Sequence, residues 1–223
     1  MPVPLIRLAV VDSTQAFLRR NPQLGFCTVL ADRQSEGRGR QGNRWESAAG
    51  EGLWMSAALP APAGVAPGLV LQRAMAATAR VLDPEGRALG LKWPNDLVAR
   101  KEGRLVKLGG ILGEQVGGRL ILGLGVNLTG APEIPGRAVP PACLADLGFR
   151  GLDPVELAGA IVHLWTDLTE NIQLLFQWPE SGDALRWEDG QGTCLGWESD
   201  GRLKVATAEG IRRLSAGDVA GLA

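Results

Sequence analysis

Short runs of apolar residues, several with β-branched members, recur along the first 130 residues and are separated by residues that favour turns. Strands are predicted over residues 5–11, 26–31, 53–59, 88–93, 107–115 and 119–128. Gly117 and Gly118 lie between the last two runs and favour a hairpin there. The pattern therefore predicts a chain rich in strands.

Helical spacing of apolar residues appears in three places. Asp12-Ser13-Thr14 is typical of a helix start, and residues 69–82 have apolar positions at the helical period. Asp153-Pro154-Val155-Glu156 favours the start of a long helix, whose apolar stripe from Leu157 to Phe176 predicts five turns packed on a core. His163, the only histidine, lies off this stripe, so we expect it at the surface. This placement argues against catalysis built on histidine or zinc.

The composition changes near residues 179–182, which predicts a domain boundary there. We therefore expect one domain over residues 1–180 and a small one over 181–223. Short apolar runs at 193–197, 202–206 and 211–214, split by tight turns, favour a small β-barrel for the second domain. Residues 129–141, with four prolines and two glycines, predict a mobile loop.

The overall composition is that of an ordinary globular protein, with 45% hydrophobic and 21% charged residues. A net charge of −1 gives no global field that would attract nucleic acid, so no nucleic-acid partner is expected. Cys27, Cys143 and Cys194 are far apart and odd in number, which predicts buried thiols in a reducing cytoplasm. No signal peptide or membrane span is visible, and no membrane partner is expected.

The run from Gly37 to Trp45 has the most unusual composition in the chain. Glycines alternate with Arg38, Arg40 and Arg44. Glycine lets a backbone approach a ligand closely, and arginine offers a planar fork of donors to carboxylate or phosphate oxygens. The run suits a loop that wraps an anionic ligand, although its spacing matches neither standard phosphate-binding motif and a basic surface loop is the plain alternative.

Three further segments place polar residues or glycines at strand ends. Lys92, Asn95 and Asp96 surround a proline turn in 91–97. The segment 106–114 begins with a lysine, Lys107, and then has two glycines, while 122–128 repeats the use of glycine inside a strand. Glycine in a strand often marks the close approach of a ligand or of another backbone. Each segment alone also has a purely structural explanation.

Together and in this order, the segments closely resemble the biotin protein ligases, also called biotin–[acetyl-CoA-carboxylase] ligases. The matching elements are Asp12-Ser13-Thr14, Gln34, the Gly37–Arg40 run, Trp45, the Lys92–Asp96 turn, Lys107–Leu112 and the glycine–asparagine pattern at 125–128. The resemblance is dense over residues 7–130 and loose over 150–218. It implies an α+β fold: a mixed, largely antiparallel sheet packed by helices, like the catalytic domain of class II aminoacyl-tRNA synthetases, plus a small Src-homology-3-like β-barrel.

The resemblance also implies an activity, a ligase reaction that forms a C–N bond. Biotin is activated with ATP as biotinyl-5′-AMP, with release of pyrophosphate, and is then transferred to a lysine of a biotin carboxyl carrier domain, with release of AMP. Mg²⁺ is expected to arrive with ATP, not at a metal site of the protein. Many relatives form homodimers through the central sheet, but the sequence assigns no interface here.

Site residues follow from the resemblance by position. The catalytic residues would be Lys107, Arg38, Arg40 and Lys92. Biotin would be bound by Ser13, Thr14, Gln15, Gln34, Arg38, Gly39, Arg40, Lys107, Gly110 and Leu112. ATP would be bound by Arg38, Arg40, Trp45, Lys92, Asn95, Asp96, Lys107 and Asn127. The division of roles among Lys92, Asn95 and Asp96 stays open.

The sequence departs from the family in three respects. Gln41 and Asn43 stand where relatives frequently have basic residues, which lowers the positive charge of the loop. Nothing before Leu5 could form a helix-turn-helix, so we expect a monofunctional ligase without the DNA-binding domain of some relatives. The C-terminal module from Leu185 to Ala223 is short and is predicted to lack its first strand or two, which puts its role in closing the ATP site in doubt.

The sequence disfavours three other functions. A lipoate–protein ligase shares the expected fold and adenylate chemistry, but its histidine–aspartate pair has no counterpart around the only histidine here. An RNA-binding module would need a clustered basic surface, whereas 23 basic residues stand against 24 acidic ones. A non-catalytic biotin sensor is disfavoured by the intact Arg38, Arg40 and Lys107.

Overall fold

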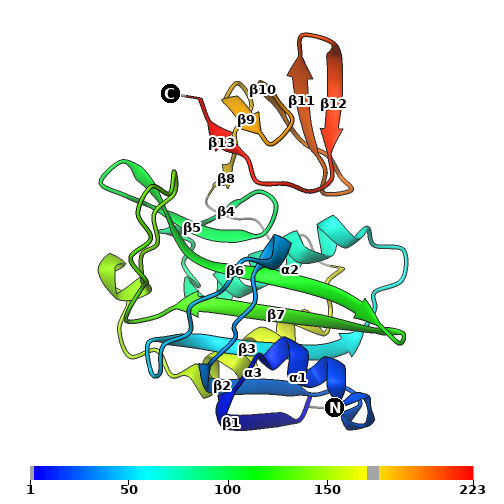
Figure 1. Cartoon of the computed structure of the whole chain (residues 1–223), viewed down its shortest axis with the longest axis vertical. Coiled ribbons are helices and arrows are strands. Elements are labelled where there is room, and N and C mark those ends of the chain that lie inside the picture. The colour runs from blue at the N-terminus through cyan, green and yellow to red at the C-terminus, as the bar shows by residue number, and fades with distance from the viewer. Residues whose placement is uncertain (1–2, 170–175, 223) are drawn as a thin grey trace.

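The larger of two sheets in the computed structural model, which describes residues 3–169 and 176–222, has eight strands. The strands are β1 (Leu5–Val11), β2 (Thr28–Gln34), β3 (Gly52–Pro60), β4 (Leu89–Lys92), β5 (Asp96–Lys101), β6 (Arg104–Val116), β7 (Arg119–Asn127) and β8 (Gln177–Trp178). They are ordered β1-β2-β3-β7-β6-β5-β4-β8 (Figure 1). Only the pairs β1–β2 and β4–β8 are parallel. The expected mixed, largely antiparallel sheet is thus confirmed.

Most of the predicted strands are found within a few residues of their expected bounds, and β5 and β8 were not anticipated. The predicted hairpin joins β6 to β7. Its turn residues Gly117 and Gly118 have φ values of 56° and 76°, which is left-handed backbone that glycine adopts without steric cost.

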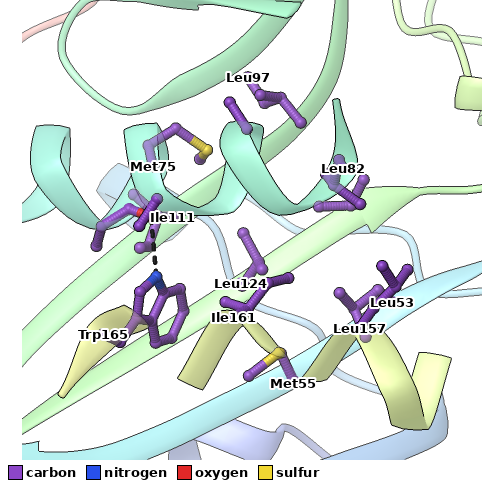
Figure 2. Close-up of a cluster of buried hydrophobic side chains, with 14 of the residues drawn as sticks. Leu53, Met55, Met75, Leu82, Leu97, Ile111, Leu124, Leu157, Ile161 and Trp165 are labelled. Carbon is purple, nitrogen blue, oxygen red and sulfur yellow. Dashed lines mark hydrogen bonds between the residues drawn. The ribbon is translucent and has the colours of Figure 1, made fainter. Parts of the chain in front are cut away.

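Three α-helices pack on the sheet within the described residues: α1 (Thr14–Arg20), α2 (Pro67–Leu82) and α3 (Pro154–Trp165). Successive residues of a strand face opposite sides of a sheet. Ala57 of β3 belongs to the core beneath α2 and α3, whereas Ala58 packs with Leu18 of α1 on the other side. Figure 2 shows the first core, where the Trp165 indole donates a hydrogen bond of 2.8 Å to the Ala74 carbonyl of α2.

The helix starts were predicted correctly. The Ser13 hydroxyl accepts from the Ala16 amide at 3.3 Å, and the Asp153 carboxylate accepts from the amides of Val155 and Glu156. Each side chain satisfies amides that the first turn leaves unpaired. In residues 3–169 and 176–222, no helix is long and apolar enough to cross a membrane.

The predicted five-turn helix is wrong over residues 166–169. Helix α3 ends at Trp165, residues 166–169 are not helical, and residues 170–175 lie outside the described part of the chain. Asp167 accepts hydrogen bonds from both the amide and the hydroxyl of Thr169, a local pattern that competes with helical bonding. Leu168 is nevertheless buried in the core. The apolar pattern therefore predicted its burial correctly but not its conformation. His163 is exposed, as expected.

The smaller sheet has five antiparallel strands in the order β12-β11-β10-β9-β13. They are β9 (Ala184–Trp187), β10 (Gly190–Trp197), β11 (Leu203–Thr207), β12 (Gly210–Leu214) and β13 (Ala220–Gly221). Strand β9 precedes the three runs predicted from the sequence and was not anticipated. Strand β9 was not predicted because it has only four residues, of which Leu185 alone is buried. An alternation of buried and exposed residues cannot be recognised over so short a segment.

Trp93 is one of the residues that link the two sheets. Trp93, between β4 and β5, is fully buried in the core of the smaller sheet, and its indole donates to the Gly201 carbonyl at 3.0 Å. Gln72 of α2 donates to the same carbonyl at 2.6 Å. The smaller sheet is thereby held beyond the β4–β8 edge of the larger one (Figure 1). The domain division after residue 180 falls between β8 and β9 and stays a prediction.

The three cysteines behave as expected. Cys27, Cys143 and Cys194 are buried and free. Burial raises the pKa of the Cys27 and Cys194 thiols, which disfavours their reactive thiolate forms.

Candidate active site

Two rows of paired residues cross the larger sheet on the face opposite α2 and α3. The longer row runs from Trp54 through Gly125 and Gly110 to Asp96 and Lys92. The shorter row joins Ser56, Gly123 and Leu112. Because directly paired residues point to the same face, the register alone brings the lysine, the aspartate and the glycines together.

The glycines leave the middle of this face without side chains. A Cβ atom on Gly125 would collide with the indole of Trp45, and one on Gly123 would collide with the side-chain oxygen of Gln15. Trp45 also lies 6.5 Å from Trp54, ring centre to ring centre, in an edge-to-face arrangement. The strand glycines were expected to mark the approach of a ligand or of another backbone, whereas the groups that approach Gly123 and Gly125 are the side chains of Gln15 and Trp45.

A cavity of about 210 Å³ opens above these rows. Every site residue predicted from the sequence lines it. They are Ser13, Thr14, Gln15, Gln34, Arg38, Gly39, Arg40, Trp45, Lys92, Asn95, Asp96, Lys107, Gly110, Leu112 and Asn127. The fold thus assembles the predicted set in one place, and the roles of its individual members stay predictions.

One end of the cavity is lined by neutral hydrogen-bonding groups. The amide and hydroxyl of Thr14 both donate to the Gln34 side-chain oxygen, at 2.8 and 3.1 Å. The Thr14 hydroxyl also lies 2.7 Å from that of Ser56, and the Gln34 amide nitrogen donates to Ser47 at 2.9 Å. This chain of bonds fixes the side chains where α1 meets β2 and β3, whereas the Gln15 side-chain oxygen is buried without a hydrogen-bond partner among the described residues.

The other end of the cavity is charged. The Lys107 ammonium lies 2.7 Å from the Asp96 carboxylate and 5.6 Å from the ring centre of Trp45. Arg40 donates from one nitrogen to the Asn95 side-chain oxygen and to the Gly217 carbonyl, each at 3.1 Å. Asn95 is itself held by donating to the Ile111 carbonyl at 2.6 Å. Lys107 is therefore held by Asp96, and Arg40 by Asn95 and Gly217.

Lys92 completes this end through an ion pair with Asp218. The Lys92 ammonium and the Asp218 carboxylate are 2.7 Å apart. Partial desolvation at the cavity wall favours the neutral form of Asp218, whose side chain is otherwise exposed, but Lys92, with help from Lys107 and Arg40, outweighs this and holds the pKa of the carboxyl below its usual value. Asp218, Val219 and Ala220 of the C-terminal module line the cavity.

The glycine–arginine run folds back on itself beside the cavity. The Trp45 amide donates to the Gly37 carbonyl at 2.9 Å, and the Gly39 amide donates to Asn43 at 2.8 Å. Residues 40–42 form a short helical turn, which Figure 1 shows in front of β6 on the side of the smaller sheet. The Arg38 side chain is exposed and lines the cavity.

Several lining residues were missed from the sequence. Ser56 could have been found as the one hydroxyl in an apolar strand, but Asp218 had no local signal because its partners lie in the other sheet. The proline-rich loop was predicted only as mobile, yet it contributes Pro132, Ile134, Arg137, Ala138, Val139 and Pro141. Asn127, which was predicted, donates to the Ala142 carbonyl just after this loop at 3.0 Å.

Comparisons with known proteins agree with this arrangement. A family model described as the biotin/lipoate A/B protein ligase family matches residues 8–130, which is more than half of the chain. The bifunctional ligase/repressor BirA of Bacillus subtilis is 28% identical over 96% of this chain and 73% of its own length. A biotin–[acetyl-CoA-carboxylase] ligase of Paracoccus denitrificans is 34% identical over 67% of this chain and 66% of its own.

A solved structure extends the similarity to the whole fold. The biotin protein ligase of Aquifex aeolicus in complex with biotin and ATP superimposes with a TM-score of 0.77 and 25% identity, covering 98% of both chains.

Proposed function

The chain belongs to the biotin/lipoate A/B protein ligase family, and from this premise we propose that it is an ATP-dependent biotin protein ligase. It activates biotin as biotinyl-5′-AMP and transfers it to a lysine of a biotin carboxyl carrier domain, that of acetyl-CoA carboxylase or a related carboxylase. The observation that carries the proposal is the single cavity with a neutral hydrogen-bonding end, a cationic end and a glycine floor between them.

The neutral end suits the head group of biotin. Its ureido ring is an uncharged donor and acceptor, and Ser13, Thr14, Gln15 and Gln34 offer both kinds of partner. The Gln15 side-chain oxygen is buried without a hydrogen-bond partner among the described residues, so a ring N–H would satisfy a group that otherwise costs free energy. Gly110 and Leu112 form the floor along which the ligand would extend.

The cationic end suits the reacting anions. In the first step an oxygen of the biotin carboxylate attacks the α-phosphorus of ATP, an acyl–phosphate bond forms, and the bond to pyrophosphate breaks. The two anions repel each other, and Arg38, Arg40, Lys92 and Lys107 line the place where they must meet. Lys107 has the central task, because its position between Trp45 and Asp96 lets its charge serve the carboxylate first and the adenylate phosphate afterwards.

Mg²⁺ would enter with ATP. Among residues 3–169 and 176–222 there is no group of three or more metal-ligating side chains. Mg²⁺ commonly needs only one or two carboxylates besides phosphate oxygens and water, and Asp96 with Asn95 supplies such oxygens on the cavity wall. When bound, Mg²⁺ would neutralise charge on the phosphates, while Lys92 and Arg40 hold their outer oxygens.

In the second step the amine of the carrier lysine attacks the acyl carbon, a C–N bond forms, and AMP leaves with the electron pair of the broken C–O bond. The proton that the amine loses during this attack passes to water. The carrier domain is the expected protein partner, in the cytoplasm, with neither nucleic acid nor membrane required. A homodimer stays an expectation without an assigned interface.

A direct experiment tests this function. Purified protein is incubated with biotin, ATP, Mg²⁺ and a carrier domain, and the intact mass of the acceptor is measured. The expected result is an acceptor heavier by one biotinyl group, with pyrophosphate release that depends on biotin. Lipoate in place of biotin serves as the control, and modification by lipoate alone would favour the lipoate ligase alternative. Absence of biotin-dependent pyrophosphate release from folded protein would overturn the proposal.

A further inference from the structure

The ion pair between Lys92 and Asp218 is unequal in burial. The Lys92 side chain is 4% exposed, whereas that of Asp218 is 67% exposed. The Lys92 ammonium gains from an anion beside it, and because Lys92 lines the cavity, this anion can also come from a ligand there. Asp218 can turn into water at little cost, because an exposed carboxylate gains only weakly from one ion pair. Lys92 is therefore a fixed cation, and Asp218 is an exchangeable partner.

The segment around Asp218 contacts two of the cations assigned to phosphate, Lys92 and Arg40. Arg40 donates to the carbonyl of the preceding residue, Gly217, at 3.1 Å. Lys107 and Arg40 also act on the Asp218 carboxylate over a longer range, in the direction that favours its charged form. Residues 217 and 218 thus offer two oxygens to the cationic end of the cavity, as a phosphate group would.

The backbone around this segment allows it to move while its ends stay fixed. Gly217 has a φ of 125°, a conformation that L side chains rarely adopt. Leu214 before it and Val219 after it are both buried in the core of the smaller sheet. A rotation at Gly217 can therefore withdraw the carboxylate without undocking the sheet.

We propose that Asp218 is a displaceable internal counter-ion of the nucleotide site. A triphosphate takes the place of the Asp218 carboxylate at Lys92 and of the Gly217 carbonyl at Arg40, and residues 215–218 swing outward. Two anions cannot share Lys92 without mutual repulsion, so the aspartate and the phosphate compete for it. The inference rests on the proposed function, because it assigns Lys92 and Arg40 to phosphate. Its consequence is a lower affinity for ATP and easier release of anionic products.

Competition predicts that removal of the carboxylate strengthens nucleotide binding. The dissociation constant of ATP with Mg²⁺ is measured by calorimetry, without biotin, for the wild type and for Asp218→Asn. The variant is expected to bind ATP about twofold to fivefold more tightly, the range of an exposed ion pair. Asp189→Asn is the matched control, since its carboxylate belongs to the same sheet, is equally exposed at 67% and pairs with Arg212 at 3.0 Å outside the cavity. This control should leave ATP binding unchanged.

Equal or weaker binding of ATP by Asp218→Asn would overturn the inference, and weaker binding would make Asp218 a residue that assists the nucleotide. Absence of ATP binding by the wild type would overturn the inference alone, whereas absence of biotin-dependent pyrophosphate release would overturn the proposed function as well, so the two failures can be told apart. A second measurement needs only the wild type. Addition of ATP should speed hydrogen exchange at the backbone amides of residues 215–219, and unchanged or slower exchange there would contradict the displacement.

Discussion

The two lysine–aspartate pairs of the cavity have the same ion chemistry and the same separation of 2.7 Å, but they are built differently. Lys107 and Asp96 lie on neighbouring strands of one sheet and are 30% and 13% exposed. Lys92 and Asp218 come from different sheets and are 4% and 67% exposed. The first pair joins adjacent strands, β5 and β6, across a shift of register between Leu97 and Val98, whereas the second exists only because the smaller sheet is docked.

This difference separates the fixed part of the site from the adjustable part. The hydrogen bonds between strands β5, β6 and β7 hold the glycine rows and the Lys107–Asp96 pair in place. A shift of one whole strand by one residue would turn its buried side chains outward. The contacts of Lys92 and Arg40 with residues 217 and 218 depend on one short segment between β12 and β13. We therefore expect changes on strands β5 to β7 to affect the chemistry most, and changes on the docked side to tune binding.

Lys107→Ala is expected to have the largest effect. Loss of one preorganised charge at the place where carboxylate and phosphate meet should lower the rate of adenylate formation by about 10²–10³-fold. The measurement is biotin-dependent release of pyrophosphate. Lys101→Ala is the matched control, because Lys101 lies on the neighbouring strand β5, pairs with Asp146 at 3.7 Å and does not line the cavity. Near-normal turnover by Lys107→Ala would transfer the central role to Lys92.

Gly125→Ala tests the glycine floor. The new methyl group would collide with the Trp45 indole, so Trp45 and the loop that carries it must move. We expect the affinity for biotinyl-adenylate, measured by calorimetry, to fall by about tenfold or more. The reason is that fitting an extra methyl group into a packed region costs about 1–3 kcal/mol. Gly159→Ala in α3 meets nothing within 4 Å and should leave the affinity unchanged while slightly stabilising the helix. Unchanged affinity for Gly125→Ala would show that the floor does not depend on glycine.

Thr14→Val tests the neutral end with a change that conserves side-chain shape. It removes the hydroxyl bonds to Gln34 and Ser56 and leaves the Thr14 amide bond in place. We expect a loss of about 1 kcal/mol in the free energy of unfolding and a severalfold weaker affinity for biotin, both from unpaired buried groups. Thr129→Val, whose exposed hydroxyl donates to Gly50 outside the cavity, is the control. Equal losses in both variants would contradict a special role for Thr14.

The smallest expected effect concerns acid stability on the docked side. Because the pKa of Asp218 is lowered in the folded protein, its charge contributes stability above the unfolded-state pKa, and this contribution is lost as the pH falls through the folded value. Denaturant titrations of the wild type and Asp218→Asn should differ by at most about 1 kcal/mol at neutral pH. The difference should fade below about pH 4. A difference that persists at lower pH would show that the carboxylate acts by something other than its charge.

The sequence by itself determined the local part of this protein. The capped helix starts, the β6–β7 turn and the apolar runs are decided by neighbours along the chain, so they were predicted almost at their observed bounds. The motifs from Ser13 to Asn127 were enough, through the family resemblance, to name the predicted site residues, and strand register places those on β4 to β7 on one face. Predictions from local patterns failed where a few residues fit more than one conformation. Examples are the four-residue strand β9 and the non-helical residues after Trp165.

Only the tertiary structure decided which residues of the smaller sheet and its loops contact the motifs. Asp218 is 126 residues from Lys92 along the chain, and no periodicity links the two. Their contact depends on the burial of Trp93 in the smaller sheet and on the hydrogen bonds that converge on Gly201. Docking of one sheet on another is a property of two assembled surfaces, and the counter-ion of Lys92 became visible only when both surfaces were in place.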